Sequence, residues 1–130
     1  MILEPEIVAR GWLDLHTRSM EDYERALSTW AEDIIREAID NDANYALRIV
    51  MALHVLTRNT EWIAIFAAGP LEDLLARQGQ VVIGDIEETS RLDPGFAHAL
   101  GGVWRNSIDE ETWARVRACR NSKDWDISVD

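Results

Sequence analysis

The sequence is poor in cysteine and proline, and what it lacks excludes several classes of protein. Cys119 is the single cysteine, so no disulfide forms within the chain and a reducing compartment is favoured. The first residues lack the basic and apolar segments of a signal peptide. No apolar run approaches the ~20 residues that span a bilayer. We therefore expect a cytoplasmic protein without a membrane segment.

Positive charge is also scarce. Thirteen basic residues face 24 acidic ones, which gives a net charge of −11, and Lys123 is the only lysine. Nucleic-acid-binding surfaces need clustered basic residues, and an anionic membrane repels an acidic protein, so we expect neither partner. The charge attracts basic proteins, although it is equally typical of a surface that only keeps a protein soluble.

Apolar residues are plentiful and recur at steps of three and four, which predicts helices almost throughout. Hydrophobic residues make up 47 % of the 130-residue chain and include six tryptophans, enough for one core. Residues 81–83 also fit a short strand. The expected helices are a short first one after Pro5, then residues 19 to about 42, 43–57, 61–68, 70–78, 81–92, 94 to about 104, and a last one beginning at a Ser107–Glu110 capping box.

Three features of this pattern give testable details. In the second helix, a stripe of apolar residues is expected to face the core. The helix over residues 43–57 is apolar on more than one face, which is typical of a central, buried helix. Gly69 is expected to turn the chain before Pro70 restarts it, and Gly79 is expected to end the helix that follows. The stripe of the second helix comprises Tyr23, Leu27, Trp30, Ile34, Ile35 and Ala38.

The predicted fold is all-α, with seven or eight helices joined by short connections. Short connections favour antiparallel neighbours, so a compact multi-helix bundle and a short irregular stack of antiparallel helix pairs both fit. Residues 1–130 contain no linker and are expected to form a single domain. The tail from about residue 121 is expected to be loosely ordered, although Trp125 and Ile127 are able to dock.

No catalytic centre is recognisable. His16, His54 and His98 do not have the spacing of helical metal ligands, and His54 falls on an apolar stripe that suits a core position. Cys119 is expected to be an inert thiol, and the Gly101–Gly102 pair to permit close helix packing. Phosphate-binding loops and nucleophile elbows are absent. We therefore expect no catalytic residue, no metal and no cofactor, and hence no enzyme.

The strongest local charge lies between residues 21 and 42, where eight acidic residues face two arginines. A basic partner would meet its strongest field along the second half of this segment. The carboxylates of Glu72 and Asp73 form a secondary candidate. The alternative for both groups is a solvated helix face. The predicted binding residues of the first group are Glu32, Asp33, Glu37, Asp40 and Asp42.

The most distinctive stretch is Ala-Ala-Gly-Pro-Leu-Glu-Asp-Leu-Leu at residues 67–75, followed by Gly79 and by Asp-Pro-Gly-Phe at residues 93–96. Together with Trp30-Ala31 upstream and Val103-Trp104 downstream, it resembles an uncharacterised family of small bacterial helical proteins marked by this box. The resemblance covers roughly residues 28 to 116. It implies a bacterial source and a helical fold, and it implies no activity. In physical terms the box is a helix junction. The alternative is that its Glu72 and Asp73 form a contact site.

These observations favour a non-catalytic acidic protein-binding module. Its most concrete form is an inhibitor or immunity-type protein that neutralises a basic partner such as a toxin or a nuclease. A regulatory or scaffold domain that binds a peptide or protein in a groove between helices is the first alternative. A small-ligand binder or an enzyme with an unrecognised pocket is the second.

Overall fold

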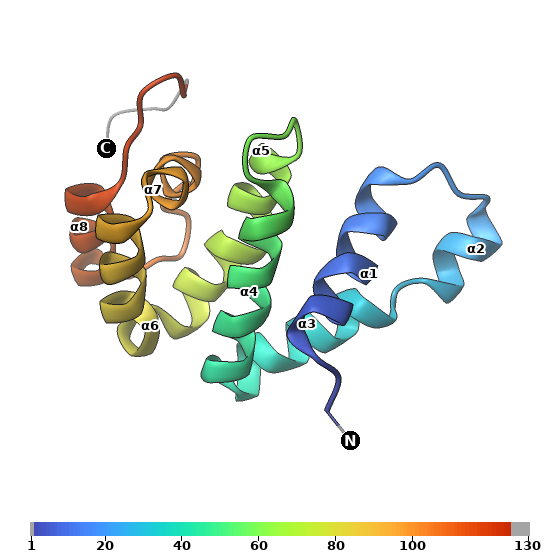
Figure 1. Ribbon diagram of the computed structural model, residues 1–130. Coiled ribbons are helices and arrows are strands. Elements are labelled where there is room, and N and C mark those ends of the chain that lie inside the picture. The colour runs from blue at the N-terminus through green and yellow to red at the C-terminus, as the bar shows by residue number, and fades with distance from the viewer. Residues whose placement is uncertain (1, 126–130) are drawn as a thin grey trace.

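The computed structural model describes residues 2–125 and contains helices, turns and no strand within that range (Figure 1). The predicted all-α class is confirmed. Six α-helices span seven residues or more, so the expected count of seven or eight is slightly high; α2 and α5 are short. The elements are α1 (Pro5–Thr17), α2 (Asp22–Leu27), α3 (Trp30–Asn41), α4 (Ala43–Thr57), α5 (Ile63–Phe66), the π-helical turn η1 (Ala67–Leu71), α6 (Glu72–Leu92), α7 (Pro94–Leu100) and α8 (Glu110–Cys119).

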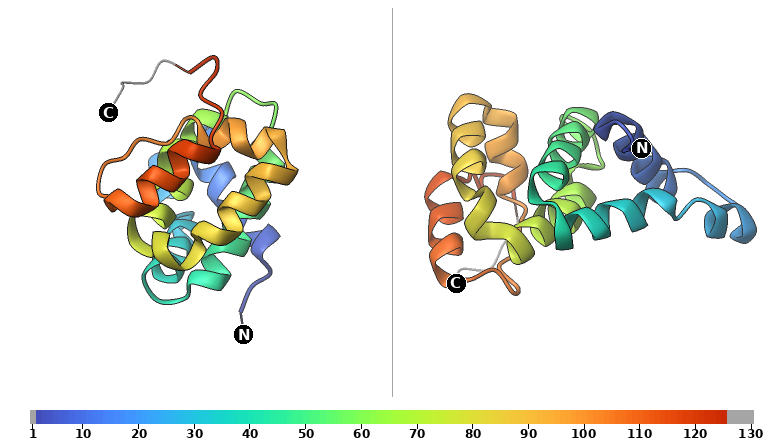
Figure 2. Two further views of the ribbon diagram at one scale, coloured as in Figure 1. Left: turned by 90° about the vertical axis from the view of Figure 1, so that its left-hand side faces the viewer. Right: turned by 90° about the horizontal axis from the view of Figure 1, so that it is seen from below.

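The helices follow one another along the molecule, from α7 and α8 at one end to α2 at the other (Figure 2). α1 packs on α3 and α4, while α6 contacts α3, α4, α7 and α8 and so links the two ends. One continuous core runs through these contacts, including Val8, Ile49, Leu74, Phe96 and Trp113. None of the described helices has the length and apolar character that crossing a lipid bilayer requires.

The helix α4 has the bounds that the sequence predicts. Asp42 precedes it and accepts a hydrogen bond from the backbone N–H of Tyr45 at 3.2 Å, which satisfies one of the free donors of the first turn. Ile49, Val50 and Leu53 are completely buried. The expectation that this is a central, buried helix is therefore confirmed.

The expected single helix over residues 19–42 is wrong, because the chain breaks at Ser28 and Thr29 into α2 and α3. The Ser28 hydroxyl donates to the carbonyl of Glu24 at 2.7 Å, a local bond that competes with helix continuation. The break turns the start of the expected stripe outward: Tyr23 and Leu27 are 68 % and 77 % exposed. Only the part of the stripe on α3, including Ile35 and Ala38, reaches the core.

The helix junction at Gly69 and Pro70 also differs from the expectation. No described glycine has a positive φ, so Gly69 is not a left-handed turn; it lies inside η1, which continues α5 into α6. Pro70 has no N–H to donate, and the wide π-helical turn accommodates it within the run. The predicted helix end at Gly79 is instead a kink at Gln78, with φ −129° and ψ 23°, and residues 81–83 are helical.

The two last helices begin at aspartates. Asp93 caps α7, which begins at Pro94 as predicted but ends at Leu100 rather than near residue 104. The expected Ser107–Glu110 capping box is wrong, because Asp109 is the cap of α8 and accepts from the N–H of Thr112.

The chain after α8 returns to α7. The Trp125 Nε1–H donates to the carbonyl of His98 at 2.8 Å, and Asn121 N–H donates to Ala97. A Cβ on Gly101 would lie 2.1 Å from the Asn121 carbonyl oxygen, so the close contact at the glycine pair is with this returning, non-helical segment and not between helices as predicted. Ile127 lies outside the described residues.

Candidate functional site

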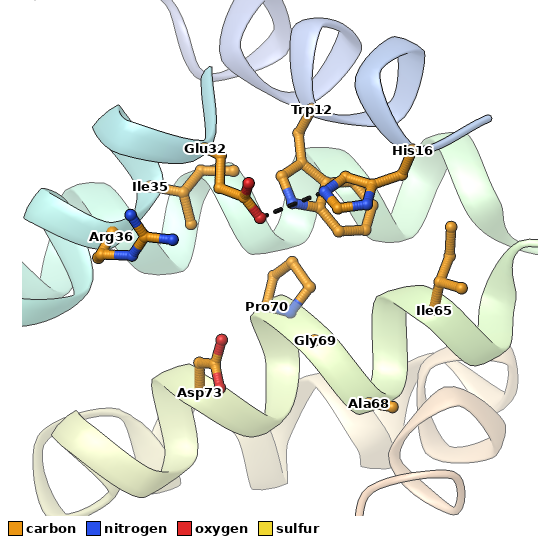
Figure 3. A pocket seen from close by; sticks show the side chains of 10 residues that line it. All are labelled: Trp12, His16, Glu32, Ile35, Arg36, Ile65, Ala68, Gly69, Pro70 and Asp73. Carbon is orange, nitrogen blue, oxygen red and sulfur yellow. Dashed lines mark hydrogen bonds and ion pairs between the residues drawn. The ribbon is translucent and has the colours of Figure 1, made fainter. Parts of the chain in front are cut away.

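The box at residues 67–75 forms one wall of a cavity of about 310 Å³. The cavity lies between α1 and α3 on one side and the run from α5 through η1 into α6 on the other (Figure 3). It therefore joins segments that are far apart in the sequence. Its lining residues are Trp12, His16, Glu32, Ile35, Arg36, Ile65, Ala68, Gly69, Pro70 and Asp73.

The wall from α1 carries two rings in contact. Trp12 and His16 are one helical turn apart, which places them on the same face, and their ring centroids are 4.3 Å apart at 34°. His16 Nε2 lies 3.3 Å from Glu32 Oε1 on α3. This contact holds the Glu32 carboxylate beside the rings at the edge of the cavity (Figure 3).

The opposite wall carries Asp73, which is exposed at the mouth and makes no hydrogen bond or ion pair with any residue in the described range. Partial desolvation raises the pKa of Asp73, and the neighbouring Glu72 carboxylate raises it further, while Arg77 and Arg36 oppose the shift. A carboxylate that the protein leaves without a close partner is available to a ligand.

Gly69 gives the floor of the cavity its shape. A Cβ built on this residue would meet only the Trp12 ring, at 3.7 Å, an ordinary van der Waals distance. The protein therefore does not need a glycine there for packing. The missing side chain leaves open volume where η1 faces α1.

The acidic residues predicted as a single binding group lie on two sides of α3. Glu32 faces the cavity of the box, whereas Asp33 and Glu37 line a second cavity of about 330 Å³ between α3 and α4. Asp40 pairs with Arg77 at 3.4 Å. Asp42 lines the second cavity and also caps α4. The second cavity has an apolar floor of Ile34, Ala38 and Tyr45.

Glu72 corrects the expectation of an exposed Glu72–Asp73 contact pair. It is only 8 % exposed. Its carboxylate accepts a hydrogen bond from the N–H of Trp104 at 2.9 Å and another from the Asn106 side chain. Glu72 therefore fixes the loop between α7 and α8, and only Asp73 faces outward.

Sequence reasoning missed the edge formed by α2 and the start of α3, because it placed Tyr23, Leu27 and Trp30 in the core. None of the residues of α2 is buried. Arg25 ties α2 to the end of α1 by donating to the carbonyls of Leu15, at 2.5 Å, and Arg18, at 3.4 Å. The Ser28-Thr29 pair is the one signal in the sequence that marks this break.

The remaining titratable groups have structural surroundings. His54 is buried and lies 3.1 Å from Asp93, as expected of a core or boundary histidine. Burial raises the pKa of the Cys119 thiol, which disfavours the reactive thiolate. The described residues contain no cluster of three or more groups able to hold a metal ion.

Comparison with known proteins adds a family and nothing more specific. The model of a family described as a family of unknown function (DUF6869) matches residues 18–124. That range contains α2–α8, the box and most of the cavity lining, and it leaves out Trp12 and His16 on α1. No curated protein and no solved structure matches the chain.

Proposed function

This chain belongs to DUF6869, a family of unknown function, and we propose that it is a non-catalytic binding module for a basic protein. The concrete form is an inhibitor or immunity-type protein that acts in the cytoplasm. The interface is the α2–α3 edge, defined as Tyr23, Leu27 and Trp30 together with the acidic residues around them.

The observation that carries this proposal is the exposure of large apolar side chains on α2, which projects from the body, and at the start of α3 (Figure 1). Tyr23, Leu27 and Trp30 are 68 %, 77 % and 40 % exposed. Burying such side chains against a partner removes apolar area from water, and tyrosine and tryptophan are enriched among the residues that dominate binding energy.

The edge is also held in place before any partner arrives. Arg25 fixes α2 on the carbonyls at the end of α1. The Trp30 ring lies directly over Gly11, where a Cβ would come within 2.5 Å of it. A helix and a ring that are already held in place lose less entropy on binding, so this edge is suited to form an interface.

Acidic residues determine the sign of the charge that the partner carries. Glu21, Asp22 and Glu24 flank Tyr23 in the sequence, and the segment over residues 21–42 contributes −6 of the net charge of −11. An acidic rim around an apolar centre steers a basic surface toward it and disfavours an acidic one.

The test compares two leucines of similar exposure on different parts of the molecule. The wild-type protein captures the partner from its host, and binding of the purified partner is measured with Leu27→Ala and with Leu92→Ala, whose leucine is 66 % exposed on α6. We expect Leu27→Ala to weaken binding at least about tenfold, equivalent to about 1.4 kcal/mol. Leu92→Ala should leave the affinity unchanged.

A second arm tests the charge. Asp22→Lys combined with Glu24→Lys should slow association most at low salt, because salt screens the steering field. Asp85→Lys combined with Glu88→Lys, two exposed positions on α6, makes the same change in net charge and is the control. Equal affinity of the Leu27→Ala and Leu92→Ala proteins would contradict the proposed interface. Capture of acidic partners alone would contradict the proposed chemistry.

A further inference from the structure

We propose that the cavity between α1, α3 and η1 binds a small organic cation, namely an ammonium or guanidinium group on a short apolar stem. This site is separate from the α2–α3 edge and does not depend on the function proposed for that edge. The cation is either a free small molecule or the side chain of a lysine or arginine in a peptide.

Two carboxylates approach the cavity from opposite walls. Glu32 comes from α3 and Asp73 from α6 (Figure 3). Asp73 has no hydrogen bond or ion pair with residues in the described part of the chain, so a ligand cation would supply the partner that the protein does not. Charge-assisted hydrogen bonds from ammonium or guanidinium to a carboxylate are among the stronger polar contacts.

The residues that line the cavity carry a net negative charge despite Arg36. Glu32 and Asp73 face one guanidinium, and Arg36 Nη1 already lies 3.6 Å from Asp33 on the surface of α3. The whole protein carries −11, which adds a long-range attraction for cations and repels anions.

The remaining lining suits an apolar stem. Ile35, Ile65, Ala68 and Pro70 provide aliphatic surface, and Trp12 provides an aromatic edge. A volume of about 310 Å³ lies at the lower end of the range of ligand pockets, roughly 300–1,000 Å³. A four-carbon chain with a charged head fits this combination of an apolar interior and carboxylates at the mouth.

Gly69 keeps the cavity open. A Cβ built on it would be in ordinary van der Waals contact with the Trp12 ring, at 3.7 Å, and its φ is not positive. A side chain there is compatible with the helical backbone and fills the cavity. Substitutions at Gly69 are therefore able to remove binding without unfolding the protein.

The experiment titrates the full chain with defined probes and follows binding by NMR and calorimetry. The probes are n-butylguanidinium and n-butylamine, with n-butanol and butyrate as uncharged and anionic controls. We expect saturable binding of the cations in the millimolar range or tighter, about what so few heavy atoms support, and no saturation with either control. N-acetyl-arginine amide distinguishes the two possible sources of the cation, a peptide side chain and a free small molecule. Tighter binding than n-butylguanidinium favours a peptide side chain, and no binding favours a free small molecule.

Variants then locate the binding. Asp73→Asn should weaken binding at least about fivefold, whereas Asp85→Asn, an exposed carboxylate on the distant part of α6, should leave it unchanged. Gly69→Val should abolish binding, and Gly69→Ala should reduce it while the melting temperature stays the same or rises. Three results would overturn the proposal. They are binding of n-butanol as tight as that of the cations, no saturation by any cation, and an equal loss of cation affinity in Asp73→Asn and Asp85→Asn. Leu27→Ala is expected to leave cation binding unchanged, so the cation site and the α2–α3 edge are tested independently of each other.

Discussion

At the scale of single residues, the contact between the buried His54 and the partly buried Asp93 joins α4 to the start of α7. His54 is 3 % exposed, and its ring lies edge-on to Phe96 with centroids 5.1 Å apart. Its Nδ1 has no partner in the described range, which fits a neutral ring that donates from Nε2 to Asp93 Oδ2. Burial lowers the pKa of His54, although Asp93 opposes the shift.

Asp93 gathers four donors onto one side chain. Besides His54, its carboxylate accepts from Arg58 at 3.1 Å and from the N–H groups of Gly95 and Phe96 at 2.9 and 3.3 Å. Burial alone would raise the pKa of Asp93, but the bonds from His54 and Phe96 outweigh it and leave the pKa lowered. Asp93 thereby ties the end of α4 to the start of α7.

We predict that acidification destabilises the fold in two steps. The unfolded histidine takes up a proton near its ordinary pKa of 6.5, while the folded one resists until lower pH. The unfolded state therefore binds more protons, and the free energy of unfolding falls as the pH drops below about 6.5. The slope is at most about 1.4 kcal/mol per pH unit for one proton. The lowered pKa of Asp93 adds a second loss as the pH falls below 3.8.

Urea unfolding at several pH values measures the first step, with His54→Gln as the comparison. Removing the titrating ring should flatten the dependence between pH 5 and 7, even if the variant is less stable throughout. The same slope in both proteins would assign the effect to other groups.

At the scale of elements, the contact between α6 and α8 depends on the absence of a side chain. A Cβ on Gly79 would lie 2.7 Å from Cγ2 of the buried Thr112. The kink at Gln78 lies next to this glycine in α6. Further along the same two helices, Arg115 donates two hydrogen bonds to Glu87, at 2.9 and 2.5 Å. The exposed ion pair between Arg115 and Glu87 adds little to stability, so the close packing at Gly79 contributes more to the contact between α6 and α8.

We predict that Gly79→Ala lowers the free energy of unfolding by about 1–3 kcal/mol, because extra volume in a packed contact forces neighbours apart. In a Thr112→Ser background, which lacks the Cγ2 methyl, the same change should cost less. Gly84→Ala is the matched control on α6, since nothing lies within 4 Å of its Cβ position. It should be neutral or stabilise by up to about 1 kcal/mol. Equal effects of the two glycine variants in thermal unfolding would contradict the packing argument.

At the scale of the whole molecule, the net charge of −11 opposes the compact state by self-repulsion. The ion pairs in the described range are mostly exposed and single, so each contributes little. Repulsion among unpaired carboxylates is therefore expected to dominate the response to salt.

We predict that sodium chloride stabilises the protein at neutral pH. Raising the concentration from about 0.01 M to 1 M shortens the screening length from roughly 30 Å to 3 Å and weakens the repulsion. The melting temperature should rise over this range, and most of the rise should occur at low concentration. Chloride is preferred to sulfate because sulfate also strengthens apolar burial. A falling melting temperature would mean that attractive pairs outweigh the repulsion.

Local patterns in the sequence determined the helical class, the bounds of α4 and the Asp93-Pro94 start of α7. Each rests on neighbours within a few residues: apolar spacing, a cap, or a proline in the first turn. The same reasoning placed Glu32 in an acidic group for a basic partner and Asp73 in a contact pair with Glu72, and both stay predictions. Such reasoning cannot tell whether an apolar stripe finds a partner. It therefore placed Tyr23 and Leu27 in the core.

Only the tertiary structure decided which distant residues meet. It placed Trp12 and His16 opposite Asp73, buried Glu72 under the loop between α7 and α8, and divided the acidic residues of α3 between two cavities. It also made Gly69 part of a continuous helical run, because packing against α1 and α3 outweighs the local tendency of glycine and proline to break one. Charge and periodicity are read along the chain, whereas a cavity depends on distances between helices that no local pattern encodes.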